Sequence, residues 1–310
     1  MRVLVTGASG FLGRHACRAL SGRGVDLVTL DLPGKPAPGP ARHIECNPAA
    51  REGASRLAAE GPFDCVVHLA GATSGEYVNL HRANVLSVEA VLAPLGRSAG
   101  RMVLAGSSAV YGRVDPSRFP VGEDEPPAPV SPYGLSMARR EEVACRLCGR
   151  LEMSLCTLRL FNLAGPGQEP VMLVPSAARQ LAMIEAGLQP PVLRLGSLAA
   201  RRDYVDARDA AEAFAAAVLE PGVSGVLNIS SGVSTGSAEV VAMLAGFFDC
   251  RPEIDAAEDG RPAGVEDLPG NPAAAFAALG WAVSIPLEKT LADIALDWKE
   301  RVAAVNGGRS

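Results

Sequence analysis

Three glycines spaced three residues apart, Gly7, Gly10 and Gly13, stand near the start of the chain, after the apolar run 3–5. Gly7 allows a sharp turn out of a strand, Gly10 lets the backbone approach a pyrophosphate because it lacks a Cβ, and Gly13 lets a helix at 11–23 pack closely. The start of that helix carries partial positive charge, which suits phosphate. A plain tight turn is the alternative, but the flanking strand and helix favour a dinucleotide site. The residues expected to contact the dinucleotide are Gly7, Ser9, Gly10, Phe11, Leu12 and Gly13.

Asp31 closes the next apolar run, 25–30, about 20 residues beyond the glycine turn. A carboxylate at this place accepts hydrogen bonds from the adenosine ribose hydroxyls and repels a 2′-phosphate, so it favours NAD(H) over NADP(H). The alternative is an aspartate that only begins a turn. Arg14 and Arg23 leave some NADP(H) binding open. We therefore expect NAD as the cofactor.

Two hydroxyl side chains, Ser107 and Tyr133, are the candidates for acid–base chemistry. Ser107 follows an apolar run at 101–105, and Tyr133 opens a helical stretch that extends to about residue 150. In doubly wound parallel sheets, ligands bind at the carboxyl ends of the strands, so both side chains are expected near the cofactor. A phenol beside a serine hydroxyl can pass a proton to or from a sugar hydroxyl while a hydride moves. The ordinary pKa of a phenol is about 10, so it needs help, usually from a positive charge, to act near neutral pH.

Strands and helices alternate through the first half of the chain, which predicts an α/β fold with a parallel, doubly wound (Rossmann) sheet. The expected strands lie at 25–30, 42–46, 63–69, 101–105 and 155–160, and the helices between them at 49–60, 76–98 and about 133–150. The strand at 63–69 runs into small residues, which leave room for the cofactor, so Leu69, Ala70 and Gly71 are expected to line it. We expect His68 to be packed or hydrogen-bonded and not to be an acid–base group.

The alternation breaks past Asn162, which predicts a second lobe. Residues 1–162 and about 203–229 are expected to form the NAD-binding domain, because a helix at 206–219 and a strand at 225–229 return to the sheet. Residues about 163–202 and 230–310 are expected to form a smaller, mainly helical, substrate-binding lobe.

Length, charge and cysteine content narrow the class of protein. The chain has 310 residues, 48% of them hydrophobic, so it can bury a large core. Its net charge of −5 argues against nucleic acid as the main partner. We see no apolar run of about 18 residues and no signal-peptide pattern, so we expect no membrane span and a cytoplasmic location. The seven cysteines suit a reducing compartment, and the pair Cys145 and Cys148 is expected to be structural, so no metal site is predicted.

Several short motifs occur together and in a fixed order along nearly the whole chain. They are Thr6-Gly-Ala-Ser-Gly-Phe-Leu-Gly13, Asp31, His68-Leu-Ala-Gly71, Asn84-Val85, Ser107-Ser-Ala-Val-Tyr-Gly112, Pro132-Tyr133, Arg159-Leu-Phe-Asn162 and Gly165-Pro166. With these motifs the chain resembles the extended short-chain dehydrogenases/reductases of the nucleotide-sugar epimerase/dehydratase/reductase group. The resemblance implies that Ser107 hydrogen-bonds the substrate oxygen and that Tyr133 is the acid/base. It also implies a homodimer formed through the helix near Asn84 and the helix after Tyr133.

One position departs from the family motif Tyr-x-x-x-Lys, because the lysine position is Met137. The family lysine binds the nicotinamide ribose and lowers the pKa of the tyrosine, and a thioether does neither. Three interpretations remain: another charge assists Tyr133, the enzyme is slow or limited in pH range, or the protein binds its ligand without turnover. Arg139 and Arg140 are not expected to substitute, since positions i+3 and i+4 are the neighbours on a helix. Met137 is still expected to line the cofactor site.

The segment 175–209 limits the range of candidate substrates. It resembles GDP-4-keto-6-deoxy-mannose reductases and, less closely, GDP-mannose 4,6-dehydratases. The resemblance implies that Arg202 and Arg261 contact the nucleotide diphosphate, for which guanidinium forks are suited. The alternatives are an ion pair of Arg202 with a neighbouring aspartate and a solvated surface charge at Arg261. Asn162 is a candidate to hydrogen-bond the phosphate or base of the substrate.

Together these features predict an NAD(H)-dependent oxidoreductase that acts at C4 of a nucleoside-diphosphate hexose, of the 4-keto-6-deoxy-sugar reductase type. Dehydration is disfavoured, because Ser108 and Ala109 stand where the 4,6-dehydratases of the group usually carry an acidic residue. The first alternative is a nucleotide-sugar 4-epimerase that retains NAD. The second, prompted by Met137, is a weakly catalytic or non-catalytic protein that binds NAD or a nucleotide sugar.

Overall fold

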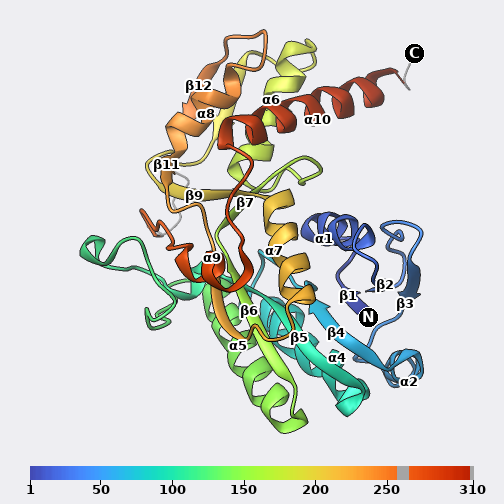
Figure 1. Cartoon of the computed structure of the whole chain (residues 1–310). Helices are drawn as coiled ribbons and strands as arrows, with labels where there is room; N and C mark the ends of the chain where they lie inside the picture. Colours follow the sequence, from blue (N-terminus) through green and yellow to red (C-terminus); the bar gives the residue numbers. More distant parts are fainter. Residues whose placement is uncertain (257–264, 308–310) are drawn as a thin grey trace.

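A seven-stranded parallel sheet forms the centre of the structure, a computed structural model that describes residues 1–256 and 265–307 (Figure 1). Its strands are β1 (Arg2–Thr6), β2 (Asp26–Asp31), β3 (Arg42–Glu45), β4 (Phe63–His68), β5 (Ala99–Ser107), β6 (Ser154–Leu160) and β10 (Gly225–Ile229). Their order is β10-β6-β5-β4-β1-β2-β3, and every neighbouring pair is parallel. The predicted doubly wound α/β fold is confirmed.

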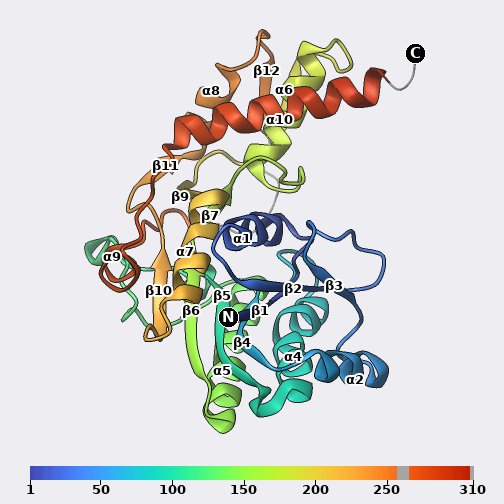
Figure 2. The same cartoon turned by 45° about the vertical axis from the view of Figure 1, so that its right-hand side comes forward.

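Helices cover both faces of this sheet, and the strands divide their side chains between the two layers (Figure 2). One layer consists of α1 (Phe11–Ser21) and α7 (Ala207–Leu219), and the other of α2 (Arg51–Glu60), α4 (Ser87–Leu95) and α5 (Pro132–Leu151). In β1, Val3 and Val5 pack in the core with α1 and α7, whereas Leu4 packs in the core with α2, α4 and α5. Successive side chains of a strand point to opposite faces, so each strand contributes to both cores.

A second lobe, at the top of Figure 1, combines helices with two small sheets. Its helices are α6 (Leu173–Glu185), α8 (Ser237–Ala245) and α10 (Leu287–Gly307). One sheet consists of β7 (Asn162–Ala164), β9 (Arg201–Asp206) and β11 (Ser234–Gly236), and the other of β8 (Val192–Leu195) and β12 (Glu253–Ala256). The mainly helical lobe therefore also contains the short strands β8, β11 and β12, which the sequence pattern does not predict. No helix in the two described ranges combines the length and the hydropathy that a bilayer span requires.

Short elements complete the chain. They are α9 (Ala273–Leu279) and the 3-10 turns Gly96–Ser98, Ser108–Val110 and Pro116–Arg118. The helix α9 packs beside β10 and α7, and Trp281, just after it, donates from its indole N–H to Asp209 O at 2.8 Å. The segment after the second lobe thereby returns to the layer of α7.

The long helix expected at 76–98 is present, but a π turn interrupts it. Helical backbone continues through α3 (Tyr77–Leu80), a π-helix at His81–Leu86 and α4. Asn84, buried in the π turn, accepts a hydrogen bond from Ala72 N at 2.7 Å and donates to Ala72 O and to Ser136 Oγ, both at 2.9 Å. The wider turn therefore lets one amide side chain join the segment after β4 to α5, and π turns of this kind often mark functional sites.

Asp203, buried in β9, fixes loops that lie far apart in the chain. Its carboxylate accepts hydrogen bonds from Ser231 N at 2.8 Å, from Ser231 Oγ at 2.7 Å, and from Gly232 N and Gly270 N, both at 3.0 Å. Burial raises the pKa of this carboxyl group, and the hydrogen bonds from Ser231 lower it. One side chain thus holds the loop after β10 and the segment before α9 against β9.

Replacing Asp203 with alanine removes the acceptor of four hydrogen bonds. We expect Asp203→Ala to lower the free energy of unfolding by about 3 kcal/mol, since a buried donor without a partner costs about 1–3 kcal/mol. Equilibrium unfolding in urea measures this difference. The control is Asp255→Ala in β12, where the side chain is exposed, and it should stay within about 0.5 kcal/mol of the wild type. Equal stabilities of the two variants would contradict the role of Asp203.

Candidate active site

The strands β1 and β4 are neighbours in the sheet, but the chain continues from them in opposite directions, to β2 on one side and to β5 on the other. The loops diverge at such a switch point, and ligands of doubly wound sheets bind there, at the carboxyl ends of the strands. Three segments border this place: the glycine turn after β1, residues 69–72 after β4, and Ser107 at the end of β5. The residues expected at the cofactor therefore come from adjacent strand ends.

The glycine turn makes contacts that a side chain would block. Gly7 has a φ of +67°, and a Cβ atom on it would lie 2.7 Å from the backbone N and Cα of Ala70. A Cβ atom on Gly13 would lie 2.6 Å from the carbonyl oxygen of Ala8. The helix α1 begins at Phe11, and within the described residues it has no side-chain cap and no acidic residue in its first turn. The turn and the helix start therefore fit the phosphates of a dinucleotide.

Asp31, at the end of β2, is held by the glycine turn. Its carboxylate accepts hydrogen bonds from Ser9 N at 2.9 Å and from Ser9 Oγ at 2.8 Å. Burial raises the pKa of the carboxyl group, and the two bonds from Ser9 lower it. The basic residues considered for a 2′-phosphate are engaged: Arg14 donates to Ser9 O at 2.7 Å and to Gly167 O at 2.8 Å, and Arg23 forms an ion pair with α7. This arrangement fits an unmodified adenosine ribose.

Ser107 and Tyr133 meet where α5 begins beside the end of β5. Ser107 is buried, and its hydroxyl oxygen accepts a hydrogen bond from Ala109 N at 3.2 Å. Ser131 caps α5 by accepting a hydrogen bond from Gly134 N at 3.0 Å, which places Tyr133 in the first turn. Burial raises the pKa of the Tyr133 phenol, and its hydrogen bond with the Ser107 side chain lowers it. The structure thus brings together two hydroxyl groups from distant parts of the chain.

Met137 follows Tyr133 by one turn of α5 and brings no charge to the site. Its side chain is 5% exposed and packs in a small apolar cluster with Val110, Tyr111 and Phe161. At the position of the family lysine, Met137 therefore makes an apolar contact between α5 and the segment that follows β5.

The expectation that Arg140 points away from Tyr133 is wrong. Seven helical residues turn the chain by about 700°, only about 20° short of two full turns, so position i+7 returns to the face of Tyr133. Arg140 is 1% exposed, and it donates hydrogen bonds from Nη1 to Ala70 O at 2.7 Å and from Nη2 to His68 O at 2.9 Å. Burial lowers the pKa of Arg140 to about 10, so its side chain stays cationic at neutral pH. The expectation holds for Arg139, which is exposed.

His68 is buried and hydrogen-bonded, as expected. Its Nδ1 lies 2.7 Å from Thr6 Oγ1, and its Nε2 lies 3.2 Å from Ser87 Oγ. Burial lowers the pKa of the imidazole well below its usual value, and the charge of Arg140 lowers it further. His68 is therefore neutral at physiological pH and holds the end of β4 in place.

Besides Ser107, three residues are expected to bind the substrate, and two of them lie in the small sheet of the second lobe. Asn162 in β7 donates from its side chain to Asp203 O at 3.3 Å. Arg202 in β9 donates from Nη1 to Val265 O at 2.8 Å, and burial lowers its pKa. The third residue, Arg261, lies outside the described residues.

The alternative ion pair of Arg202 with Asp203 or Asp206 is wrong. Asp203 accepts the loop hydrogen bonds described above, and Asp206 pairs with Arg208 at 2.7 Å. Within the part of the chain that the structure describes, all hydrogen bonds from the Arg202 side chain use Nη1. Nη2 of Arg202 forms no hydrogen bond with any of the described residues.

Comparison with known proteins agrees with this site. Residues 3–230 match the NAD dependent epimerase/dehydratase family. The chain belongs to this family. It is similar to the GDP-6-deoxy-D-mannose reductase of Pseudomonas aeruginosa, with 30% identity over 97% of this chain and 98% of that protein. The match confirms the predicted family, the prediction that the protein is an enzyme, and NAD as its cofactor.

Two solved structures show the same fold over nearly the whole chain. The structure of RMD from Pseudomonas aeruginosa complexed with NADPH has 28% identity and a TM-score of 0.85, and covers 97% of this chain and 99% of its own. The UDP-glucose 4-epimerase of Thermus thermophilus complexed with NAD has 27% identity and a TM-score of 0.84, and covers 96% of this chain and 99% of its own.

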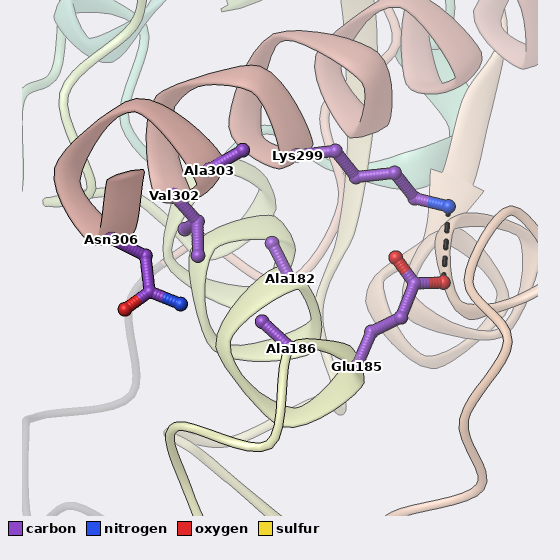
Figure 3. Close-up of a pocket in the computed structure, with 7 residues that line it drawn as sticks. All are labelled: Ala182, Glu185, Ala186, Lys299, Val302, Ala303 and Asn306. Carbon is purple, nitrogen blue, oxygen red and sulfur yellow. Dashed lines mark hydrogen bonds and ion pairs between the residues drawn. The ribbon is translucent and has the colours of Figure 1, made fainter. Parts of the chain in front are cut away.

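A separate hollow lies between α6 and α10 in the second lobe (Figure 3). Ala182, Ala186 and Val302 supply part of its apolar lining, and an ion pair between Lys299 Nζ and Glu185 Oε1 at 3.0 Å lies at one side. Its two charged side chains are paired with each other, so this hollow offers no acid–base group. The candidate active site is therefore at the carboxyl ends of β1, β4 and β5.

Gly13→Ala tests the contact between α1 and the glycine turn. The new methyl group would overlap the carbonyl of Ala8, so α1 must shift away from β1. We expect the affinity for NADH to fall by about tenfold or more, with a loss of stability of about 1–3 kcal/mol. Isothermal titration calorimetry measures the affinity. The control Gly22→Ala, at the other end of α1, meets nothing within 4 Å at a φ of −82°, and it should bind NADH like the wild type. Unchanged binding by Gly13→Ala would contradict this use of the turn.

Proposed function

We propose that this protein is an NAD(H)-dependent oxidoreductase that acts at C4 of a nucleoside-diphosphate hexose and reduces the ketone of a 4-keto-6-deoxy sugar. The observation that carries the proposal is the pairing of Ser107 with Tyr133 at the end of β5, beside the carboxyl ends of β1 and β4. Similarity to a GDP-6-deoxy-D-mannose reductase over nearly the full length of both chains supports the reductase type.

The cofactor lies along the strand ends in this proposal. The residues that would hold its phosphates are Gly7, Ser9, Gly10, Phe11, Leu12 and Gly13. Asp31 would bind the adenosine ribose, and its contact with Ser9 supports a preference for NAD(H), although one similar structure holds NADPH. The residues that would line the nicotinamide half are Leu69, Ala70, Gly71, Tyr133 and Met137. Bound NAD(H) supplies or accepts the hydride.

The hydroxyl groups of Ser107 and Tyr133 position the C4 oxygen of the sugar and transfer a proton to it. Ser107 donates a hydrogen bond to the oxygen at C4 of the sugar and holds the carbonyl beside Tyr133. As the carbonyl carbon receives a hydride, Tyr133 gives its phenolic proton to the same oxygen. The ketone gains one hydride and one proton and becomes an alcohol, and the reverse reaction returns the proton to Tyr133.

The second lobe would hold the nucleotide diphosphate. Arg202 is supported by the backbone of Val265 and keeps Nη2 for a phosphate oxygen. Asn162 lies beside β9 in the same small sheet and would hydrogen-bond the phosphate or the base. We assign Arg261 to the same diphosphate on the basis of the family resemblance.

A nucleotide-sugar 4-epimerase is the second candidate, because a UDP-glucose 4-epimerase aligns with 96% of this chain at 27% identity. A binding protein without turnover is the third, because Met137 brings no charge to Tyr133. Mixing the protein with NADH and a panel of GDP-, UDP- and dTDP-sugars, with products read by mass spectrometry, separates the three. A product heavier by two hydrogens and consumption of NADH identify the reductase. An isomer without loss of NADH identifies the epimerase, and NADH binding without product favours the binding protein.

We place the protein in the cytoplasm. All seven cysteines are free. Burial raises the pKa of both Cys17 and Cys65 to about 12, which keeps them as unreactive thiols. Free thiols of this kind fit a reducing compartment.

Tyr133→Phe tests the proton donor. We expect its kcat to fall by about 100- to 10,000-fold, because the ring stays but the transferable proton is lost. NADH affinity, measured by calorimetry, should stay near that of the wild type. Tyr77→Phe, an exposed tyrosine on α3, is the matched control and should keep full turnover. Undiminished turnover by Tyr133→Phe would rule out the proposed mechanism.

We also propose a homodimer formed by α3, α4 and α5. Neighbouring elements of this region expose large apolar side chains: Val78 is 60% exposed, Leu86 44% and Leu135 39%. Exposed apolar side chains on adjacent elements are typical of an interaction surface. A second copy that supplied the same elements would bury them in an isologous contact.

Leu86→Arg tests the dimer. We expect light scattering to report the mass of a dimer for the wild type and of a monomer for Leu86→Arg, because a charge in the centre of an apolar contact is costly. Leu296→Arg, at a position on α10 that is 56% exposed, is the control and should remain a dimer. A monomeric wild type, or a dimeric Leu86→Arg, would contradict the proposed interface.

A further inference from the structure

Arg140 carries a buried charge without an acidic partner. Its guanidinium donates to Ala70 O and His68 O, and its Nε is buried with no hydrogen-bond partner in the described part of the chain. None of the ion pairs between described residues includes Arg140, and its neighbour Glu141 pairs instead with Arg159 at 2.8 Å. Burying a cation without a counter-charge destabilises a protein. A cation buried beside the end of β4 at this cost points to a role beyond packing.

The position of Arg140 directs its charge toward Tyr133. Helical side chains lean toward the N-terminus of their helix, so Arg140 reaches back along the face of α5 that carries Tyr133. Met137 lies between them and is uncharged. The charge of Arg140 lowers the pKa of Tyr133, and Tyr133 in turn raises the pKa of Arg140 more than Glu141 does.

Other ionisable groups near the start of α5 do not cancel this charge. Those nearest to its start are Tyr77, His81, His68, Tyr111, Arg159, Arg139, Glu141 and Glu142; elsewhere on α5 and the elements packed against it lie Arg82, Glu89, Arg101, Cys145, Arg146, Cys148 and Arg150. Arg82, Glu89, Arg146 and Arg150 are exposed, and Arg101 donates to the carbonyl oxygens of Glu220 and Val223. His68 is neutral, and the Tyr111 hydroxyl donates to Asn228 Oδ1 at 2.7 Å. Glu141 and Arg159 neutralise each other inside, and Arg139 and Glu142 do so at the surface. Among the described residues, Arg140 is therefore the unneutralised buried charge on the side of Tyr133.

We propose that Arg140 supplies the positive charge that stabilises the phenolate of Tyr133, in place of the lysine that the family motif has at position 137. The inference rests on the proposed function, in which Tyr133 exchanges a proton with the sugar. The charge lies about one turn further along the same face of α5, and its bonds to the carbonyl groups of His68 and Ala70 hold it there. Arg140 is a positioning residue: it acts through Tyr133 and through the backbone after β4.

The pKa of Tyr133 tests this proposal without any turnover. The chain has four tyrosines, so ultraviolet titration of each variant is compared with the same variant carrying Tyr133→Phe, and the difference isolates Tyr133. Arg140→Gln removes the charge but keeps an amide donor for the carbonyl groups, and Arg140→Lys keeps the charge. We expect the pKa of Tyr133 to rise by about one unit or more in Arg140→Gln and to stay near the wild-type value in Arg140→Lys.

A second experiment restores a positive charge near Tyr133 at another position. Adding Met137→Lys to Arg140→Gln should return the pKa of Tyr133 toward the wild-type value, which a merely structural role of Arg140 would not produce. An unchanged pKa in a folded Arg140→Gln variant overturns the proposal. If Arg140→Gln does not fold, Arg140→Lys decides, because a pKa of Tyr133 raised by a full unit despite the retained charge also overturns it.

The pH dependence of turnover gives an independent readout. Reduction needs protonated Tyr133, so activity is lost as the pH rises through the pKa of Tyr133. In Arg140→Gln that pKa is higher, so the alkaline limb of kcat should move to higher pH, while kcat itself falls by about tenfold because the phenol is a weaker acid. Absence of turnover in the wild type would count against the proposed function, whereas the titration of Tyr133 would still decide the role of Arg140.

Discussion

Residues 68–72, which continue β4 beyond the edge of the sheet, are the segment on which the rest of the site is built. The sheet diverges here, so strand neighbours satisfy only part of this backbone: Leu69 N donates to Thr6 O in β1 at 3.2 Å, and the other buried peptide groups need other partners. Side chains supply them: Arg140 binds the carbonyl oxygens of His68 and Ala70, and Asn84 binds both polar groups of Ala72. The glycine turn can therefore pack against a rigid strand end.

The parts of this arrangement that depend on local pattern were predictable from the sequence. The alternating cores, the turn at Gly7 and the hydroxyls of Ser107 and Tyr133 follow from hydrophobic periodicity, from glycine spacing and from the positions of strand ends. The π turn was not predictable, because one extra residue shifts the apolar spacing by a single position, which in so short a helix is not distinct from ordinary variation in spacing. The contacts of Asn84 show what the turn does. The strands β8 and β12 are short and pair only with each other, so neither carries a strong signal alone.

Arg140 was missed for a different reason. The sequence argument considered only positions i+3 and i+4, which lie one helical turn from Tyr133. Position i+7, two turns away, lies on the same face of the helix, and a long side chain there reaches back toward Tyr133. Its burial also depends on carbonyl groups from β4, which no local pattern reports. For Arg202 the neighbouring acids suggested an ion pair, but both acids have other partners in three dimensions. The pairing of charged side chains was thus the least predictable part of the site, because it depends on which groups lie close together in three dimensions and not on which are neighbours in the sequence.

Arg14 connects two parts of the molecule that handle different ligands in the proposed function. Its guanidinium donates to Ser9 O within the glycine turn and to Gly167 O in the loop that leads to α6, and next to it the Nε2 of His15 lies 3.2 Å from Pro166 O. These contacts give the turn and the loop of the second lobe a direct physical connection. Because equilibrium coupling between two sites is reciprocal, whatever a dinucleotide does to the affinity for a sugar nucleotide, the sugar nucleotide does equally to the affinity for the dinucleotide. Two dissociation constants alone are then not enough to describe the loading of this protein, because one interaction free energy, shared by both ligands, must be added to them.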